Sequence, residues 1–156
     1  MAAWGPPGHG KSTWALKVAA DLVRIGKTVL YVSAEEGLAE SVSERLRRLE
    51  IRDEAMLVAG PMNWPTTEAV AREHDCSVIM LDSWSASGWV VPDLDQLRDR
   101  FFAVVTLHAT KSDEAAGPAA ILHVADVVVE VRDGKAKLSK SRWGSVLETE
   151  VIHHVE

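Results

Sequence analysis

Residues 5–12 combine residue types suited to binding a phosphate. They read GPPGHGKS and fit the spacing G-x-x-x-x-G-K-[ST] of the phosphate-binding P-loop. Glycines and prolines shape a loop whose backbone N–H groups point at an anion, and a helix beginning there adds partial positive charge. Lys11 is placed to reach the β- and γ-phosphates of a nucleotide, and Ser12 to offer its hydroxyl to Mg²⁺.

The alternative is a glycine-rich turn before an ordinary helix. The order of loop, helix and strand favours a nucleotide site, so ATP and Mg²⁺ are the expected ligands. His9 occupies a variable position of the motif and receives no role of its own. The residues expected to bind the nucleotide are Gly5, Pro6, Pro7, Gly8, His9, Gly10, Lys11, Ser12 and Thr13.

Asp82 follows the apolar run VIML, the pattern known as Walker B. An acid at that position can hold Mg²⁺ through a water, together with Ser12. The alternative is that Asp82 only caps the following loop. Trp84 and Trp89 lie in that loop, where they could stack on bases or belong to a core or an interface.

Glu35 ends the apolar run TVLYVSA and is the candidate general base, because ATP hydrolysis needs a carboxylate that polarises a water. Glu36 is either a solvated neighbour or the base itself. Both acids could instead only favour a helix N-terminus. His108 ends another apolar run. It is either a γ-phosphate sensor or only a polar residue at the end of a strand. With Ser83 and Thr110, these residues should face one site at the strand ends.

Hydrophobic patterning predicts alternating strands and helices, followed by a hairpin at Asp133-Gly134. This order predicts an α/β fold of three layers, with a mainly parallel sheet and a C-terminal antiparallel hairpin. Gly26 and either Thr66 or Thr67 are expected helix caps. The expected strands are 1–4, 28–33, 55–59, 77–82, 102–107, 126–132, 135–140 and 146–153; the expected helices are 11–24, 38–49, 66–74 and 93–100, with helical turns at 119–125 and loop at 83–92.

Bulk composition limits the function classes. The chain has 156 residues, of which 47% are hydrophobic, and a net charge of −6. A net negative charge argues against nucleic-acid binding by the whole surface, but it is compatible with a local basic groove. Cys76 is the single cysteine, which leaves no disulfide or cysteine-based metal site. No apolar run approaches a membrane span, and no signal peptide precedes the P-loop, so we expect a cytoplasmic protein.

These motifs together resemble the RecA-like P-loop ATPases, in particular the RadA-type recombination ATPases and the DnaB and RepA-type hexameric helicases. TVLYVSAEEG resembles the strand that ends in the catalytic glutamate, which implies that role for Glu35, and VIMLDS resembles the family's Walker B. LHATKSDEAAGPAAILHVADVVVEV resembles the sensor strand, the second DNA loop and the next strand. LSKSRWGS is similar to the K-N-R-F-G signature, with Ser141 and Trp143 in place of Asn and Phe.

The resemblance implies one RecA-like ATPase core over residues 1–156, acting on single-stranded DNA in recombination, repair or replication as a homo-oligomeric ring or filament. It also implies that Lys140 and Arg142 reach the γ-phosphate of a neighbouring subunit. With Lys111, Lys135 and Lys137 they would form a basic strip. The alternative is an ATP-dependent assembly or switch protein of the same fold without DNA. A small-molecule kinase fits poorly, because the loops lack an arginine-bearing lid.

Overall fold

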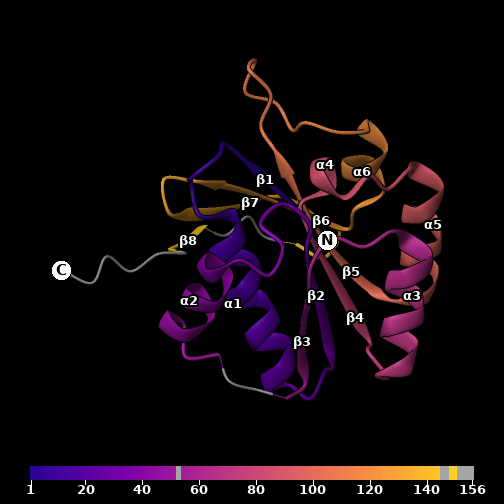
Figure 1. Ribbon diagram of the computed structural model, residues 1–156. Coiled ribbons are helices and arrows are strands. Elements are labelled where there is room, and N and C mark those ends of the chain that lie inside the picture. Colours follow the sequence, from indigo (N-terminus) through magenta and orange to yellow (C-terminus); the bar gives the residue numbers. More distant parts are fainter. Residues whose placement is uncertain (52–53, 145–147, 151–156) are drawn as a thin grey trace.

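The structure, a computed structural model, describes residues 1–51, 54–144 and 148–150. In these residues eight strands form one sheet in the order β3-β2-β4-β5-β1-β6-β7-β8 (Figure 1). From β3 to β6 in this order the strands run parallel, whereas β7 is antiparallel to both of its neighbours, β6 and β8. The strands are β1 (Ala2–Gly5), β2 (Val29–Ser33), β3 (Met56–Ala59), β4 (Val78–Asp82), β5 (Phe102–His108), β6 (Val127–Arg132), β7 (Lys135–Ser141) and β8 (Glu148–Glu150).

Helices cover both faces of this sheet, as Figure 1 shows. Successive strand residues point to opposite faces, so Leu30 and Val32 pack with α3, α4, α5 and α6, whereas Val29 and Tyr31 pack with α1 and α2. The predicted three-layer α/β fold is therefore confirmed. The helices are α1 (Lys11–Arg24), α2 (Glu40–Arg48), α3 (Trp64–Glu73), α4 (Trp84–Ser87), α5 (Val91–Arg100) and α6 (Ala119–Val124).

The short strand β1 lies in the middle of the sheet, between β5 and β6. Ala2 and Ala3 are completely buried, one on each side of the sheet. Parallel strands bring their carboxyl ends to one edge, so the segments after β1, β2, β4 and β5 gather there. The P-loop follows β1 at this edge.

Helix boundaries depend on caps that the sequence analysis located only in part. The end of α1 is as predicted, because the N–H groups of Gly26 and Lys27 donate to the carbonyls of Val23 and Leu22, as in a Schellman motif. The predicted cap of α3 was wrong: Asn63 caps it, since its side-chain oxygen accepts the N–H of Thr66 at 3.0 Å.

Other boundaries also differ from the prediction. The helix expected from residue 38 begins at Glu40, and Leu38 is 67% exposed instead of packed. The expected loop 83–92 contains α4 and the first residues of α5. The α5 helix begins at Val91 because the Asp93 carboxylate accepts the N–H of Val90, two residues before the predicted start.

The C-terminal hairpin forms around Asp133 and Gly134 as predicted, with both residues at positive φ. Of the predicted strand 146–153, residues 148–150 form β8, and the rest lies outside the described residues. Within the part of the chain that the structure describes, no helix has the length and apolarity to cross a membrane.

Candidate nucleotide-binding site

The P-loop leaves β1 at Gly5 and enters α1 at Lys11. A Cβ atom at Gly5 would lie 2.0 Å from the carbonyl oxygen of Val131, so only glycine fits this close approach. Gly10 takes φ of 98° at the N-cap of α1, and no side chain caps the helix there. The first N–H groups of α1 therefore lack a side-chain acceptor, which is the arrangement that binds a phosphate.

A cavity of about 310 Å³ opens above this loop. Three parts of the chain line it: Pro7, Gly8, Gly10, Lys11, Ser12 and Thr13 from the P-loop region; Glu35, Glu36 and His108 from strand ends; and Arg45 and Arg48 from α2. Most of the predicted nucleotide-binding residues thus share one cavity. Gly5, Pro6 and His9 do not line it, and Asp82 is not part of its wall.

Lys11 is only 6% exposed, and its Nζ donates to the carbonyl oxygen of Pro6 at 2.8 Å. Burial lowers its pKa, whereas the charges of Asp82 and Glu35 act in the opposite direction. A buried ammonium is stabilised by an anion placed against it. The cavity, the uncapped helix start and this lysine therefore fit a nucleotide phosphate.

Glu35 and His108 come together across the cavity although they are 73 residues apart, from position 35 to position 108. His108 Nε2 lies 3.0 Å from Glu35 Oε2 and 3.2 Å from Ser83 Oγ. The backbone explains this contact: the N–H of Glu35 donates to the carbonyl of Asp82, and Gly5 pairs with His108 between β1 and β5. Thr110 instead bonds Ser112 and Glu114 within its own loop.

Glu36 has a different environment from Glu35. It accepts hydrogen bonds from Ser41 and from Arg45, whose Nη2 lies 3.1 Å from Glu36 Oε1. Burial on its own would raise the pKa of Glu36, but these hydrogen bonds outweigh that effect and lower it. Glu36 is therefore tied to α2, whereas the Glu35 side chain is 52% exposed beside the cavity.

Asp82 is held by two partners that the sequence did not indicate. Its Oδ2 accepts the hydroxyl of Tyr31 at 2.6 Å, and its Oδ1 accepts the hydroxyl of Thr106 at 2.6 Å. All three side chains are buried. Burial and the neighbouring Asp82 raise the pKa of Tyr31 well above its ordinary value, so the phenol keeps its proton and donates. Asp82 pairs in register with Ser33, the last residue of β2. The segment that carries Glu35 follows directly after Ser33.

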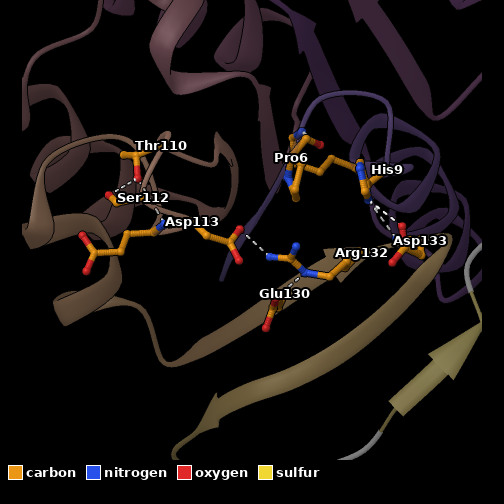
Figure 2. A network of polar contacts seen from close by, with 10 residues as sticks. Pro6, His9, Thr110, Ser112, Asp113, Glu130, Arg132 and Asp133 are labelled. Atoms are coloured by element: carbon orange, nitrogen blue, oxygen red, sulfur yellow. Dashed lines mark hydrogen bonds and ion pairs between the residues drawn. The ribbon is translucent and has the colours of Figure 1, made fainter.

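His9 points toward Asp133 in the hairpin turn, as Figure 2 shows, and it does not line the cavity. Its Nδ1 accepts the backbone N–H of Asp133 at 3.0 Å, and its carbonyl accepts the N–H of Gly134. The Asp133 carboxylate also lies 3.0 Å from Nδ1, a contact that becomes an ion pair only when the histidine is protonated. His9 thus fastens the P-loop to the β6–β7 turn.

Arg132 extends this connection to the loop after β5 (Figure 2). Its Nη2 donates to Asp113 Oδ1 at 2.6 Å, and its Nε donates to Glu130 at 3.0 Å. The loop that carries Asp113 projects beyond the sheet in Figure 1. One side of the P-loop is therefore linked through the hairpin turn to the loop 109–117.

Lys140 and Arg142 are not brought to this cavity. Lys140 pairs with Val128, which pairs with Ala2, so it lies at the amino edge of the sheet, opposite the P-loop. Its Nζ donates to the carbonyls of Leu122 and His123 at the end of α6, and Arg142 Nε lies 2.9 Å from the Asp126 carboxylate.

The two loop tryptophans belong to the core. Trp84 is 6% exposed and Trp89 is 5% exposed. The Trp89 Nε1 donates to the carbonyl of Met62, and its ring packs edge-to-face on Trp64. Rings as deeply buried as these cannot stack on a base, so this alternative was wrong for both residues.

Comparison with known proteins finds relatives named DNA repair protein RadA. The chain is 32% identical over 142 residues to the DNA repair protein RadA of Helicobacter pylori (strain J99), a match covering 80% of this chain and 32% of the relative. It is 29% identical over 171 residues to the DNA repair protein RadA of Aquifex aeolicus, covering 95% of this chain and 38% of the relative. It is 30% identical over 176 residues to that of Pseudomonas aeruginosa, covering 95% and 37%.

The chain thus spans about a third of the length of the curated relatives it matches. No protein-family profile matches it. The parallel sheet with its terminal hairpin, the P-loop at the carboxyl edge and these similarities lead to one conclusion. The chain is similar to the DNA repair protein RadA over most of its own length, and its sheet and phosphate-binding loop match the RecA-like P-loop fold.

Proposed function

We propose that this chain binds ATP with Mg²⁺ and hydrolyses it, as one RecA-like core. The observation that carries the proposal is a single cavity that joins the P-loop, the buried Lys11 and the contact between Glu35 and His108. Hydrolysis needs phosphate-binding groups and a water-orienting carboxylate in one place. Lys11 with the P-loop and the Glu35 carboxylate, which we propose for these two tasks, both line this cavity.

Each side chain then has a distinct task. Lys11 and the first N–H groups of α1 bind the β- and γ-phosphates. Ser12 and Asp82 would hold Mg²⁺, Asp82 through a water, because Tyr31 and Thr106 already use one side of each of its oxygens. Held by Ser12 and Asp82, the ion would neutralise charge on the phosphate oxygens. Glu35 orients the attacking water and accepts its proton, and His108 contacts the γ-phosphate from the end of β5.

Glu35 is preferred to Glu36 as the base because of their surroundings. Glu36 already accepts hydrogen bonds from Ser41 and Arg45. Those bonds lower its pKa, and a less basic carboxylate is a weaker proton acceptor. The Glu35 carboxylate is about half exposed and lies in contact with His108.

We further propose that the chain acts on single-stranded DNA in repair or recombination, which would place it in the cytoplasm. The name of the relatives supports repair more than helicase action in replication. Lys111 is exposed in the projecting loop, and Lys135 and Lys137 are exposed along β7. The alternative, a nucleotide switch without DNA, is favoured by the net charge of −6.

We also propose a homo-oligomer, a ring or filament, in which Lys140 and Arg142 act on a neighbouring subunit's nucleotide. Their place at the amino edge of the sheet keeps them from the cavity of their own chain. Only a head-to-tail contact between copies would bring them to a phosphate, and such contacts close rings or extend filaments.

The test measures ATP hydrolysis and single-strand binding together. We expect the chain to hydrolyse ATP with Mg²⁺, and to bind an oligonucleotide in the presence of a non-hydrolysable ATP analogue, with affinity that falls as salt rises. Lys11→Ala should lose ATP affinity by ~10-fold or more, because a charge-assisted contact is removed. ATP turnover without oligonucleotide binding at low salt would favour the switch. Unchanged ATP affinity in Lys11→Ala by calorimetry would contradict the site.

A further inference from the structure

The α2 helix presents two arginines to the wall of the P-loop cavity, a feature that the sequence analysis missed. Arg45 and Arg48 line the same cavity as Lys11 and Glu35. Arg48 is exposed at the rim, whereas the Arg45 side chain is 19% exposed. Arg45 is therefore the more buried of the two cations.

The position of Arg45 follows from the way α2 packs. Val42 is 3% exposed and fixes the buried side of the helix, and residue i+3 lies on the same side, one turn on. The segment between β2 and α2 is short, and its turn is closed by the Gly37 N–H donating to the Ser33 carbonyl. The helix therefore places Arg45 next to Glu36, which follows the end of β2.

Glu36 holds the guanidinium of Arg45 beside Glu35. Arg45 Nη2 lies 3.1 Å from Oε1 and 3.4 Å from Oε2 of Glu36. Because a guanidinium has five N–H donors, this contact leaves most of its donors for another acceptor. The pair also neutralises Glu36, which would otherwise repel a phosphate beside it.

We infer that Arg45 binds the terminal phosphate of a nucleoside triphosphate held in its own subunit, and so distinguishes a triphosphate from a diphosphate. The inference rests on the proposed function. In that function the bond to be cleaved lies beside Glu35, and Arg45 is held by the adjacent residue. The P-loop and Arg45 line the same cavity, and Lys11 with α1 is already assigned to phosphate binding. Arg45, next to Glu35 in this reading, would add a contact that only the terminal phosphate of a triphosphate offers.

The experiment compares affinities for a non-hydrolysable ATP analogue and for ADP, each with Mg²⁺, by calorimetry. Arg45→Ala should weaken binding of the analogue by roughly 10- to 100-fold and of ADP by less than about twofold, because hydrogen bonds to a charged group are lost only with the triphosphate. Arg45→Lys should give an intermediate loss, since an ammonium keeps the charge but not the fork of donors. Glu36→Gln should also weaken the analogue selectively, because it releases the guanidinium.

The matched control is Arg47→Ala. Arg47 lies on the same helix, its loss changes the net charge equally, and it is exposed outside the cavity wall. It should leave both affinities unchanged. Thermal melting shows whether each variant is folded. If Arg45→Ala does not fold, the affinities of Arg45→Lys for the two nucleotides decide between the outcomes.

The results separate this inference from the proposed function. If wild type binds neither nucleotide, the proposed function fails and the inference falls with it. Suppose instead that wild type binds both the analogue and ADP and that Lys11→Ala weakens both. If the Arg45 variants then keep both affinities, or lose both equally, only the inference is overturned. Equal losses would show that the pair of Arg45 and Glu36 merely anchors α2. A selective loss of the triphosphate analogue supports the inference.

Discussion

Both carboxylate oxygens of Asp82 accept a hydrogen bond from a buried neighbour, Tyr31 on β2 and Thr106 on β5. The three strands that carry these residues are adjacent in the sheet. This arrangement fixes the direction of the carboxylate and satisfies a charge that is 6% exposed. The acid proposed to hold Mg²⁺ is thus also part of the structural core.

We predict that Tyr31→Phe destabilises the fold by about 1–3 kcal/mol, because it leaves one oxygen of a buried carboxylate without its donor. The shift in the urea midpoint measures this loss. Thr106→Val is the matched variant for the other oxygen. A double variant with a loss smaller than the sum would show that both act on the same group. Unchanged midpoints in both single variants would contradict this role of the hydroxyls.

Glu35 lies at the cavity with its carboxylate beside His108. We predict that Glu35→Gln still binds ATP but hydrolyses it about 10²- to 10⁴-fold more slowly, because the amide keeps the shape and loses the base. Single-turnover kinetics at saturating ATP measure the effect. Glu40→Gln, the same change at the start of α2, should turn over like wild type. If Glu35→Gln turned ATP over as fast as wild type, the general base would be Glu36 or another group.

At the scale of elements, three segments far apart in sequence are joined beside the P-loop. His9 contacts the β6–β7 turn, and Arg132 at the end of β6 contacts Asp113 in the loop 109–117 (Figure 2). That loop also carries its own hydrogen bonds, including those of the Thr110 hydroxyl. Its position relative to the P-loop therefore depends on the contact between Arg132 and Asp113 and on the hydrogen bonds within the loop.

We predict that Arg132→Ala increases hydrogen exchange of the amides in 109–117 by about two- to fivefold. Exposed ion pairs contribute little to global stability, so the loop should open more often while the fold remains. Exchange followed by mass spectrometry measures this. Arg24→Ala, which removes an exposed pair with Asp21 on α1, is the control and should leave the loop unchanged. Equal exchange in Arg132→Ala and wild type would show that the loop is held by its own bonds.

At the scale of the whole molecule, the sheet separates two sets of charged residues. The P-loop cavity lies at the carboxyl edge, and Lys140 and Arg142 lie at the amino edge. Both cations contact groups of their own chain there, the last carbonyls of α6 and the Asp126 carboxylate. A role at a neighbour's phosphate would require them to exchange these partners on assembly.

We predict that two inactive variants restore activity when mixed: Glu35→Gln, and the double variant Lys140→Ala/Arg142→Ala. In a shared site, some interfaces then combine an intact base from one subunit with intact cations from the other. Cations supplied across an interface contribute about 10³- to 10⁵-fold in some nucleotide hydrolases. ATPase activity across mixing ratios measures the effect, in assemblies shown to exchange subunits. If no ratio exceeds the activity of either variant alone, the two cations do not act across the interface.

The sequence by itself determined the order of strands and helices and the phosphate-binding loop, because these depend on local spacing and hydrophobic period. It also placed Glu35, Asp82 and His108 at strand ends. Only the tertiary structure decided which partners those ends have, since contacts between β2, β4 and β5 depend on sheet order and register. Tyr31 and Thr106 on Asp82, Arg45 on Glu36 and the burial of Trp84 arise in this way. Local patterns carry no information about which distant side chain faces a given residue.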